Sequence, residues 1–164
     1  MEAMSLRARW VLPIAGCAID GGYVQIGGGR IVAVDAARPP GPVEDLGDVA
    51  LLPGFVNAHT HLEFSDLATP LGAPGMSLPD WIRLVIAQRK RRDHDAPAAI
   101  AEGCRESLAA GVTTVGEIAA AGAEAYSGLE GAPALLPFQE VLGFSGPRVD
   151  SAYSELVRRY EAAA

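Results

Sequence analysis

The stretch Leu52-Pro-Gly-Phe-Val-Asn-Ala-His-Thr-His-Leu-Glu63 decides how the rest of the chain is interpreted. An apolar run from Gly54 to Ala58 begins after Pro53 and ends at two histidines. On a β-strand, residues i and i+2 point to the same face and lie about 6.5 Å apart. His59 and His61 can therefore converge on one ion, each with a ring nitrogen about 2.0–2.1 Å from zinc. By spacing alone, two histidines with no shared task are a slightly better interpretation, so the surrounding sequence has to decide.

Helical patterns follow this stretch. After a Pro- and Gly-rich loop at 69–79, Asp80 is placed to cap a helix with an apolar side. Asp95 begins a second helix, which ends before Gly111, and Asp150 or Ser151 caps a last amphipathic helix. The segment after the histidines therefore contains three expected helices.

Strand-like stretches at 112–115 and 134–141 alternate with those helices. Alternating strands and helices are typical of a parallel sheet with helices packed outside it. In such folds the active site lies at the carboxyl ends of the strands. Because His59 and His61 end the first of these strands, their position favours a shared metal over two unrelated histidines.

The first 52 residues have the signals of strands and turns. Trp10 to Ile19 is a strand candidate, and the stretches 23–26 and 30–34 flank Gly27-Gly28-Gly29 as a β-hairpin. A phosphate-binding loop is excluded here because a strand, and not a helix, follows the glycines. The proline-rich stretch 36–47 is expected to be a loop.

Length and charge limit the possible functions. The chain of 164 residues holds about three βα units, whereas a closed (β/α)8 barrel needs eight and typically about 250 residues. We therefore expect a longer protein or a truncated one. The net charge of −7 disfavours nucleic acid as a partner, and no apolar run approaches the ~18 residues of a membrane span.

One stretch near the start allows a different interpretation. Arg7 and Arg9 precede an apolar run that ends at Cys17, as in a lipoprotein signal. Pro13 interrupts this short run, so we interpret it as a strand and expect a cytoplasmic protein. Cys17 and Cys104 form no disulfide framework and are expected to be reduced thiols.

The stretch 52–63 resembles the first barrel strand of the amidohydrolase superfamily, in the branch of cytosine deaminases, chlorohydrolases and aminofutalosine deaminases. Two more segments fit: Gly29-Arg-Ile-Val-Ala-Val34 is similar to the family's N-terminal hairpin, and Gly111-Val-Thr-Thr-Val-Gly-Glu117 to its second barrel strand. The resemblance implies an α/β fold. Strands of an N-terminal β-sandwich (1–52) would precede the first part of an incomplete TIM-like (β/α)8 barrel (53–164).

The resemblance also implies chemistry. His59 and His61 would be metal ligands for a divalent ion, zinc in the first place and iron as the alternative. The metal would activate a water for attack on an sp² carbon that bears nitrogen or a halide. The expected reaction is hydrolysis of a non-peptide carbon–nitrogen bond of a small molecule, such as deamination of a cyclic amidine or amide. The family's other ligands and its acid/base belong to later strands, so no residue of this chain is assigned as catalytic.

Several other residues have two interpretations each. Glu63 follows the second histidine and would contact substrate or cap a turn. Glu117 and Glu140 lie near the ends of later strands and would support the site or be solvated. Asn57 is expected to hold backbone, and His94 to lie on the surface. The run Arg89-Lys-Arg-Arg92 is interpreted as a solvated helix end and not as a nucleic-acid patch.

Two alternatives to an active enzyme stay open. A chain without the later ligands would be an inactive truncated product, or a scaffold that serves as an interaction module. An incomplete barrel also leaves strand edges that favour pairing with another chain. A homo-oligomer or a complementing C-terminal half is therefore an expected partner beside the small-molecule substrate.

Overall fold

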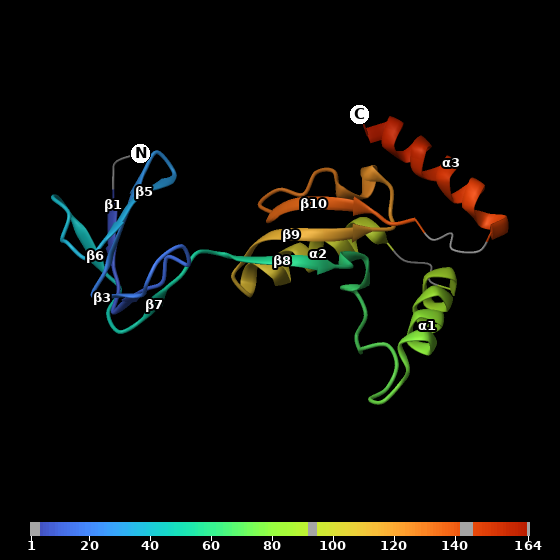
Figure 1. Ribbon diagram of the computed structural model, residues 1–164, viewed down its shortest axis with the longest axis horizontal. Helices are drawn as coiled ribbons and strands as arrows, with labels where there is room; N and C mark the ends of the chain where they lie inside the picture. Colours follow the sequence, from blue (N-terminus) through green and yellow to red (C-terminus); the bar gives the residue numbers. More distant parts are fainter. Residues whose placement is uncertain (1–3, 92–94, 142–145, 164) are drawn as a thin grey trace. The chain divides into compact units, whose positions relative to one another are not determined.

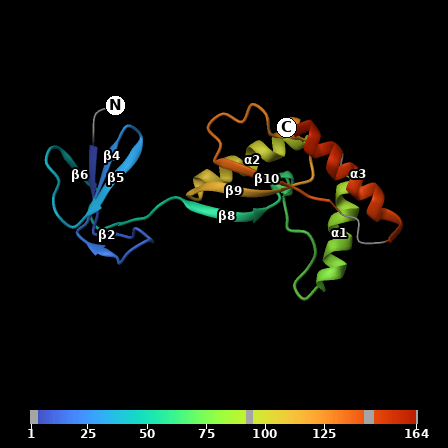
Figure 2. The ribbon, with the colours of Figure 1, turned by 45° about the horizontal axis from the view of Figure 1, so that its top comes forward.

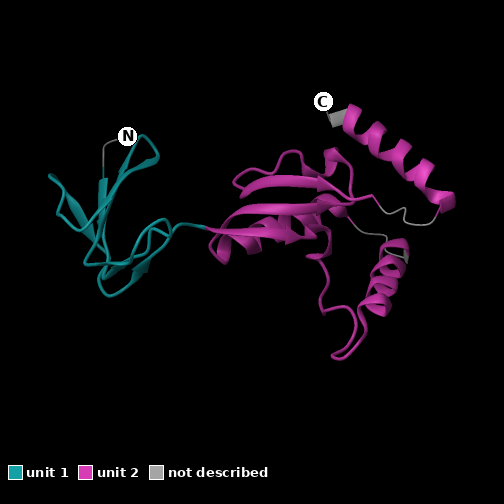
Figure 3. Ribbon diagram, in the orientation of Figure 1, with its two compact units in different colours: residues 1–54 teal, residues 55–164 magenta. Residues whose placement is uncertain are grey.

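The computed structural model describes residues 4–91, 95–141 and 146–163. The chain divides into two compact units, residues 1–54 and residues 55–164 (Figure 3). Unit 1 is built from short strands, and unit 2 from a parallel sheet with helices (Figure 1). None of the described helices is long and apolar enough to cross a membrane.

The described strands of unit 1 form two small sheets. One has the order β5-β4-β1-β6 and the other the order β3-β2-β7. The expected hairpin is confirmed: β4 and β5 pair antiparallel, and Gly28 and Gly29 turn the chain with φ of +58° and +75°. Ala8, Val11 and Val24 form the buried core of this unit. The strand bounds are β1 (Met4–Arg7), β2 (Trp10–Val11), β3 (Ile19–Asp20), β4 (Tyr23–Gly27), β5 (Arg30–Asp35), β6 (Val43–Asp45) and β7 (Ala50–Leu51).

Two expectations for unit 1 were wrong. The stretch from Trp10 to Ile19 is not one strand, because the chain turns after Pro13 through Ile14, whose φ is +65°. Its ends, β2 and β3, pair antiparallel with each other instead. The stretch 36–47 is not only a loop, since β6 lies within it and pairs parallel with β1.

Unit 2 is built on a three-stranded parallel sheet, as the sequence predicted. The order is β10-β9-β8, with bounds β8 (Phe55–Thr60), β9 (Val112–Ala119) and β10 (Ala134–Gln139). Helix α2 (Ala96–Ala109) runs along this sheet in both views (Figures 1 and 2). The buried cluster joins residues of the sheet, α2 and two short 3₁₀ helices, η1 (Leu62–Phe64) and η2 (Ala123–Tyr126). Its members are Leu62, Ile100, Cys104, Val115 and Ala125.

The other side of this sheet has exposed apolar residues. The parallel registers place Val56 beside Thr114, Leu136 beside Gly116 and Phe138 beside Ile118. Val56, Leu136 and Phe138 are 67%, 50% and 54% exposed. A sheet face that is exposed to solvent normally carries polar residues. An apolar open face is therefore typical of a sheet that is covered on both sides.

Gly116 lets the central strand approach the histidine strand closely. A Cβ at this position would lie 2.6 Å from the carbonyl oxygen of Ala58, a backbone atom that side-chain rotation cannot move. We expect Gly116→Ala to lower the free energy of unfolding by about 1–3 kcal/mol, the usual cost of overpacking. Gly146→Ala is the control, because nothing lies within 4 Å of its Cβ. Urea unfolding of both variants tests this, and equal stability of the two would contradict it.

Two of the three helices begin earlier than the sequence suggested. Helix α1 (Leu78–Arg91) starts before Asp80, and Ser77 accepts the Asp80 N–H at 3.4 Å, so Asp80 lies in the first turn and is not the cap. Helix α3 (Gly146–Ala163) starts before Asp150. The start of α2 is confirmed: the Asp95 carboxylate accepts the Ala98 N–H at 3.1 Å.

Candidate active site

The two histidines lie at the carboxyl end of the parallel sheet. His59 is on β8, and His61 is the N-cap residue of η1, directly after the strand. The centroids of the two imidazole rings are 5.5 Å apart, with the ring planes at 78°. His59 is exposed and His61 is half-buried. The structure therefore brings the two predicted ligands together at the edge where parallel α/β folds bind their ligands.

Asn57 stabilises the backbone on which these histidines lie. Its side-chain oxygen accepts the N–H of His59 at 3.2 Å. The pairing of β8 with β9 is irregular between Asn57 and Thr60, so the neighbouring strand does not fix this segment by a regular register. The expectation that Asn57 holds backbone is confirmed.

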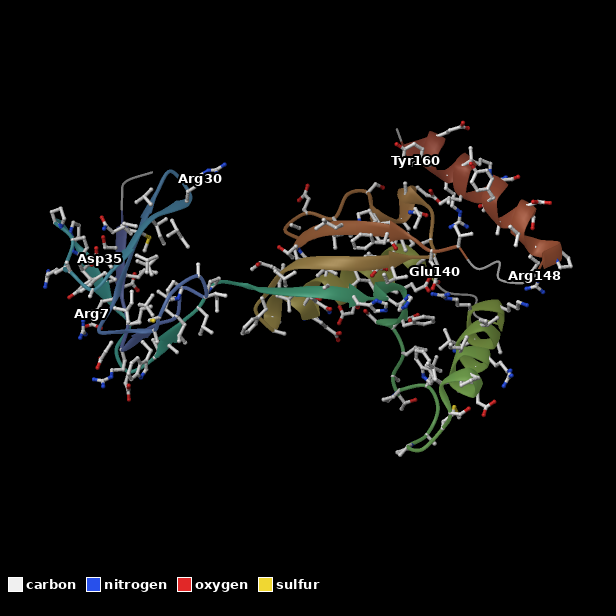
Figure 4. All side chains as sticks on the ribbon, in the orientation of Figure 1. Arg7, Arg30, Asp35, Glu140, Arg148 and Tyr160 are labelled. Atoms are coloured by element: carbon white, nitrogen blue, oxygen red, sulfur yellow. The ribbon has the colours of Figure 1, made fainter. Side chains whose placement is uncertain are left out.

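Arg89, on helix α1, contacts three acceptors: Glu63, Glu140 and His61 itself. Its guanidinium donates to Glu63 at 2.7 Å and to Glu140 at 2.8 Å, and it approaches Nδ1 of His61 at 3.2 Å. The guanidinium also lies 5.3 Å from the ring centroid of Phe64. Figure 4 shows Glu140 just past the end of β10. One cation thus ties α1 to the ends of β8 and β10.

The interpretation of Arg89 as part of a solvated helix end was wrong. Its side chain is 20% exposed, and its partners Glu63 and Glu140 are 7% and 23% exposed. These partners lie 26 and 51 residues earlier and later in the chain, so the local run of cations gave no sign of them. Glu140 is likewise not simply solvated. Sequence reasoning missed Arg89 as a member of the site.

The contact with Arg89 indicates which nitrogen of His61 carries the ring proton. Arginine is a hydrogen-bond donor only, so Nδ1 of His61 is the acceptor in this contact and the ring proton is on Nε2. Burial lowers the pKa of His61, and the nearby positive charge of Arg89 lowers it further, while Glu140 opposes the shift. Both factors favour a neutral imidazole, the form that binds metal ions.

Glu117 is held inside the sheet at the same edge. It is 0% exposed, one of its carboxylate oxygens accepts the N–H of Leu62 at 2.9 Å, and the other accepts the Tyr126 hydroxyl at 3.0 Å. Burial raises its pKa, and the two hydrogen bonds oppose this shift. The interpretation of Glu117 as a solvated carboxylate is therefore wrong, whereas the interpretation as a supporting residue agrees with these contacts.

An apolar cleft of about 550 Å³ lies next to His61. Thr69, Arg89 and Glu140 join His61 as its polar lining residues. The apolar walls come from η1, the loop after it and α1. Those apolar residues include Phe64, Leu67, Leu71, Trp81, Ile82 and Val85. Mostly apolar clefts of this size with a few polar groups are typical of small-molecule sites.

The donor chemistry of the histidine pair fits a divalent metal in part. Imidazole suits zinc and iron, and rings at the observed separation can each place a nitrogen about 2.0–2.1 Å from one zinc ion. Among residues 4–91, 95–141 and 146–163, no three His, Cys, Asp or Glu side chains are grouped to hold a metal. The pair therefore supplies two donors, whereas catalytic zinc usually has three protein ligands.

The remaining predicted residues are placed as follows. The carboxylate of Glu63 is buried and directed to Arg89, and its expected contact with substrate stays a prediction. His94 lies outside the described residues.

Comparison with known proteins identifies the family. The profile of the amidohydrolase family matches residues 50–159. The chain is 31% identical over 138 residues to an aminodeoxyfutalosine deaminase from a Nitratiruptor species, covering 80% of this chain and 34% of that protein. It is also 31% identical over 152 residues to a 5-methylthioadenosine/S-adenosylhomocysteine deaminase from Nitratidesulfovibrio vulgaris, covering 86% and 34%. The chain thus spans about a third of the length of these curated relatives.

Solved structures have the same fold over most of the chain. An aminofutalosine deaminase from Helicobacter pylori, in complex with methylthio-coformycin, aligns with a TM-score of 0.72 and 22% identity over 94% of this chain and 40% of its own. An N-isopropylammelide isopropylaminohydrolase from Burkholderia multivorans aligns with a TM-score of 0.63 and 24% identity, over 96% and 43%. The profile match covers two thirds of the residues and confirms the family expected from the sequence: the chain belongs to the amidohydrolase family.

Proposed function

We propose that the protein carrying this chain is a metal-dependent hydrolase that deaminates a cyclic amidine. The observation that carries the proposal is the pair His59 and His61, with ring centroids 5.5 Å apart at the carboxyl edge of a parallel sheet. Membership of the amidohydrolase family and two relatives named as deaminases support it. In the reaction, a water oxygen adds to the ring carbon and the bond from that carbon to the amino group breaks. The amino group leaves as ammonia with one proton of the water, and the other proton of the water ends on the adjacent ring nitrogen. The ring carbon becomes a carbonyl.

Residues of this chain would bind the metal ion and orient its two histidine ligands. His59 and His61 would bind zinc or iron, which lowers the pKa of a bound water to about 7 and so supplies a nucleophile at neutral pH. Asn57 fixes the backbone of His59. Nε2 is the nitrogen of His61 that does not contact Arg89, so it is the one that would bind the metal, with the ring proton on Nδ1. Arg89 would then have to leave Nδ1, with Glu63 and Glu140 nearby as acceptors.

The apolar cleft beside His61 would bind the part of the substrate that does not react. Its volume of about 550 Å³ and its mostly apolar walls suit a small organic molecule. The polar end, at His61, Arg89 and Glu140, would face the amino group that is replaced. A 6-aminopurine nucleoside with an apolar substituent fits this distribution of polar and apolar walls.

We also propose that residues 53–164 form the first part of a (β/α)8 barrel and that residues 1–52 form part of a β-sandwich domain. The apolar open face of the β10-β9-β8 sheet supports the first, since the inside of a barrel is a packed core. Two adjacent small sheets with a shared apolar core support the second.

Ammonia release tests the proposed function. The full-length protein that carries this chain is loaded with Zn²⁺ or Fe²⁺ and given adenosine, 5-methylthioadenosine, S-adenosylhomocysteine and aminodeoxyfutalosine. We expect one equivalent of ammonia per equivalent of the 6-oxo product from at least one of them, and none from the chelator-treated protein. Metal-loaded protein that releases no ammonia from any of these compounds would contradict the proposed deamination.

A second candidate is a scaffold without catalytic activity. It is favoured by one observation: the described residues supply two metal donors but no group of three. In that case the chain would act through a partner, a second copy or a complementing C-terminal half, and would bind no metal tightly by itself.

A further inference from the structure

Glu117 is a fully buried carboxylate in the central strand of unit 2. Carboxylates are rarely buried without partners, because their transfer from water is very costly. Each carboxylate oxygen of Glu117 accepts a hydrogen bond, one from the N–H of Leu62 at 2.9 Å and the other from the hydroxyl of Tyr126 at 3.0 Å. With no exposed surface and both oxygens engaged, Glu117 has no access to a substrate or a solvent proton. It is therefore not a general acid or base.

The Leu62 amide is the point at which the chain leaves the histidine strand. Leu62 is the first residue of η1, and it follows His61 directly. The first N–H groups of a helix have no partner within it and need an acceptor from elsewhere. The usual acceptor is the N-cap side chain, but His61 makes no such bond. A residue 55 positions later in sequence, Glu117, takes this role.

We propose that Glu117 is a positioning residue that fixes His61 for metal binding, by holding the Leu62 amide and so the turn at which His61 lies. The inference rests on the proposed function. His61 has φ −125° and ψ 83°, outside the regular helix, and its carbonyl oxygen accepts the Phe64 N–H at 3.1 Å, so the turn of η1 holds it on one side. The bond to Glu117 restrains this backbone from the side of β9, while Arg89 contacts the side chain of His61 from α1.

The close packing of η1 against α2 supports the same restraint. A Cβ at Gly103 would lie 2.8 Å from Cδ2 of Leu62. Helix α2 therefore packs closely against the side chain of Leu62, the residue whose amide is bonded to Glu117. Leu62 itself is 2% exposed. The side chain and the amide of Leu62 are thus both fixed, which leaves the preceding His61 little freedom to move.

Two variants of Glu117 separate the effect of its two hydrogen bonds from the effect of its negative charge. In Glu117→Gln the amide oxygen can accept the Leu62 N–H and the amide nitrogen can donate to the Tyr126 oxygen, so both bonds persist without the charge. Glu117→Asp keeps the charge but is one methylene too short to reach both partners. We therefore expect the glutamine variant to behave as the wild type and the aspartate variant to lose the positioning.

The experiment is Co²⁺ titration of the full-length, metal-free protein that carries these residues. The visible absorption of Co²⁺ reports its ligand geometry, and hydrogen exchange of the Leu62 amide reports the bond itself. Circular dichroism confirms that each variant is folded. We expect Glu117→Gln to bind Co²⁺ within about threefold of the wild type with the same spectrum. Glu117→Asp should bind at least tenfold more weakly, with faster exchange at Leu62.

Each outcome of this titration bears on the inference. Equal Co²⁺ affinity and spectra in the wild type and Glu117→Asp would overturn the inference, and so would a loss of binding in Glu117→Gln as large as in Glu117→Asp. In both cases the wild type binds Co²⁺, so the proposed metal site survives. A wild type that binds no Co²⁺ would instead overturn the proposed metal-dependent function, and this inference with it.

Discussion

Replacing both His59 and His61 by alanine is expected to lower turnover by about a thousandfold or more. The two rings are the donors that the described residues bring together, at a centroid distance of 5.5 Å. A catalytic metal ion contributes several kcal/mol to transition-state stabilisation, and each 1.4 kcal/mol or so corresponds to a factor of ten in rate. Ammonia release and bound metal, measured on the same preparations, test this result.

The matched control is Thr60→Ser, which changes the residue between the two histidines on the same segment. It is expected to keep both metal and turnover, since its side chain supplies no nitrogen donor. A double alanine variant that retains turnover close to that of Thr60→Ser would remove the histidine pair from the mechanism.

Replacing Arg89 by methionine is expected to destabilise the protein by about 3 kcal/mol. The change removes the ion pairs that Arg89 makes with Glu63 and Glu140, both mostly buried, and leaves these carboxylates without that countercharge. Losing one partner of a buried ion pair costs about 3–5 kcal/mol, and we take the lower end because Arg89 keeps some contact with solvent. Methionine keeps a long apolar side chain at this position. Urea unfolding near neutral pH measures the change.

Arg83→Met on the same helix is the control for this result. Arg83 pairs with Asp80 at 2.6 Å, but their side chains are 74% and 60% exposed. Exposed pairs of this kind contribute at most about 1 kcal/mol. Equal stability of Arg89→Met and Arg83→Met would contradict this prediction. It would mean that the ion pairs of Arg89 with Glu63 and Glu140 do not stabilise the packing of α1 against the sheet.

The parts of unit 2 that the sequence predicted depend on local signals. The apolar run before His59 predicted β8, and Asp95 predicted the start of α2, because a capping side chain and its amide are neighbours in the chain. Gly111, expected after the end of α2, has a φ of +81° that suits glycine. In each case the residues that make the structure lie within a few positions of one another.

The parts that the sequence did not predict depend on distant partners. Arg89 is paired with carboxylates 26 and 51 positions away, and Glu117 caps an amide 55 positions away, so neither pattern is visible in a local window. In unit 1, β2 has two residues and pairs with β3 and β7. A strand of that length has no measurable alternation, which is why the stretch from Trp10 was misinterpreted.

The site could therefore be located from the sequence, but its organisation could not. The histidines were placed at a strand end by spacing and context alone. The arginine that contacts His61 and the buried carboxylate behind its turn become visible only when the ends of three strands and α1 are brought together. Two features of the site thus come from tertiary structure: the guanidinium of Arg89 that donates to His61, and the carboxylate of Glu117 that accepts the N–H of Leu62.

The most direct test of the central claim is the metal content of the full-length protein that carries this chain, measured by elemental mass spectrometry beside its His59→Ala/His61→Ala variant. We predict near-stoichiometric zinc or iron in the wild type and its loss in the variant, with both proteins folded by circular dichroism. Metal-free wild-type protein after purification with added Zn²⁺ or Fe²⁺, or equal metal in the two proteins, would contradict the assignment of His59 and His61 as metal ligands.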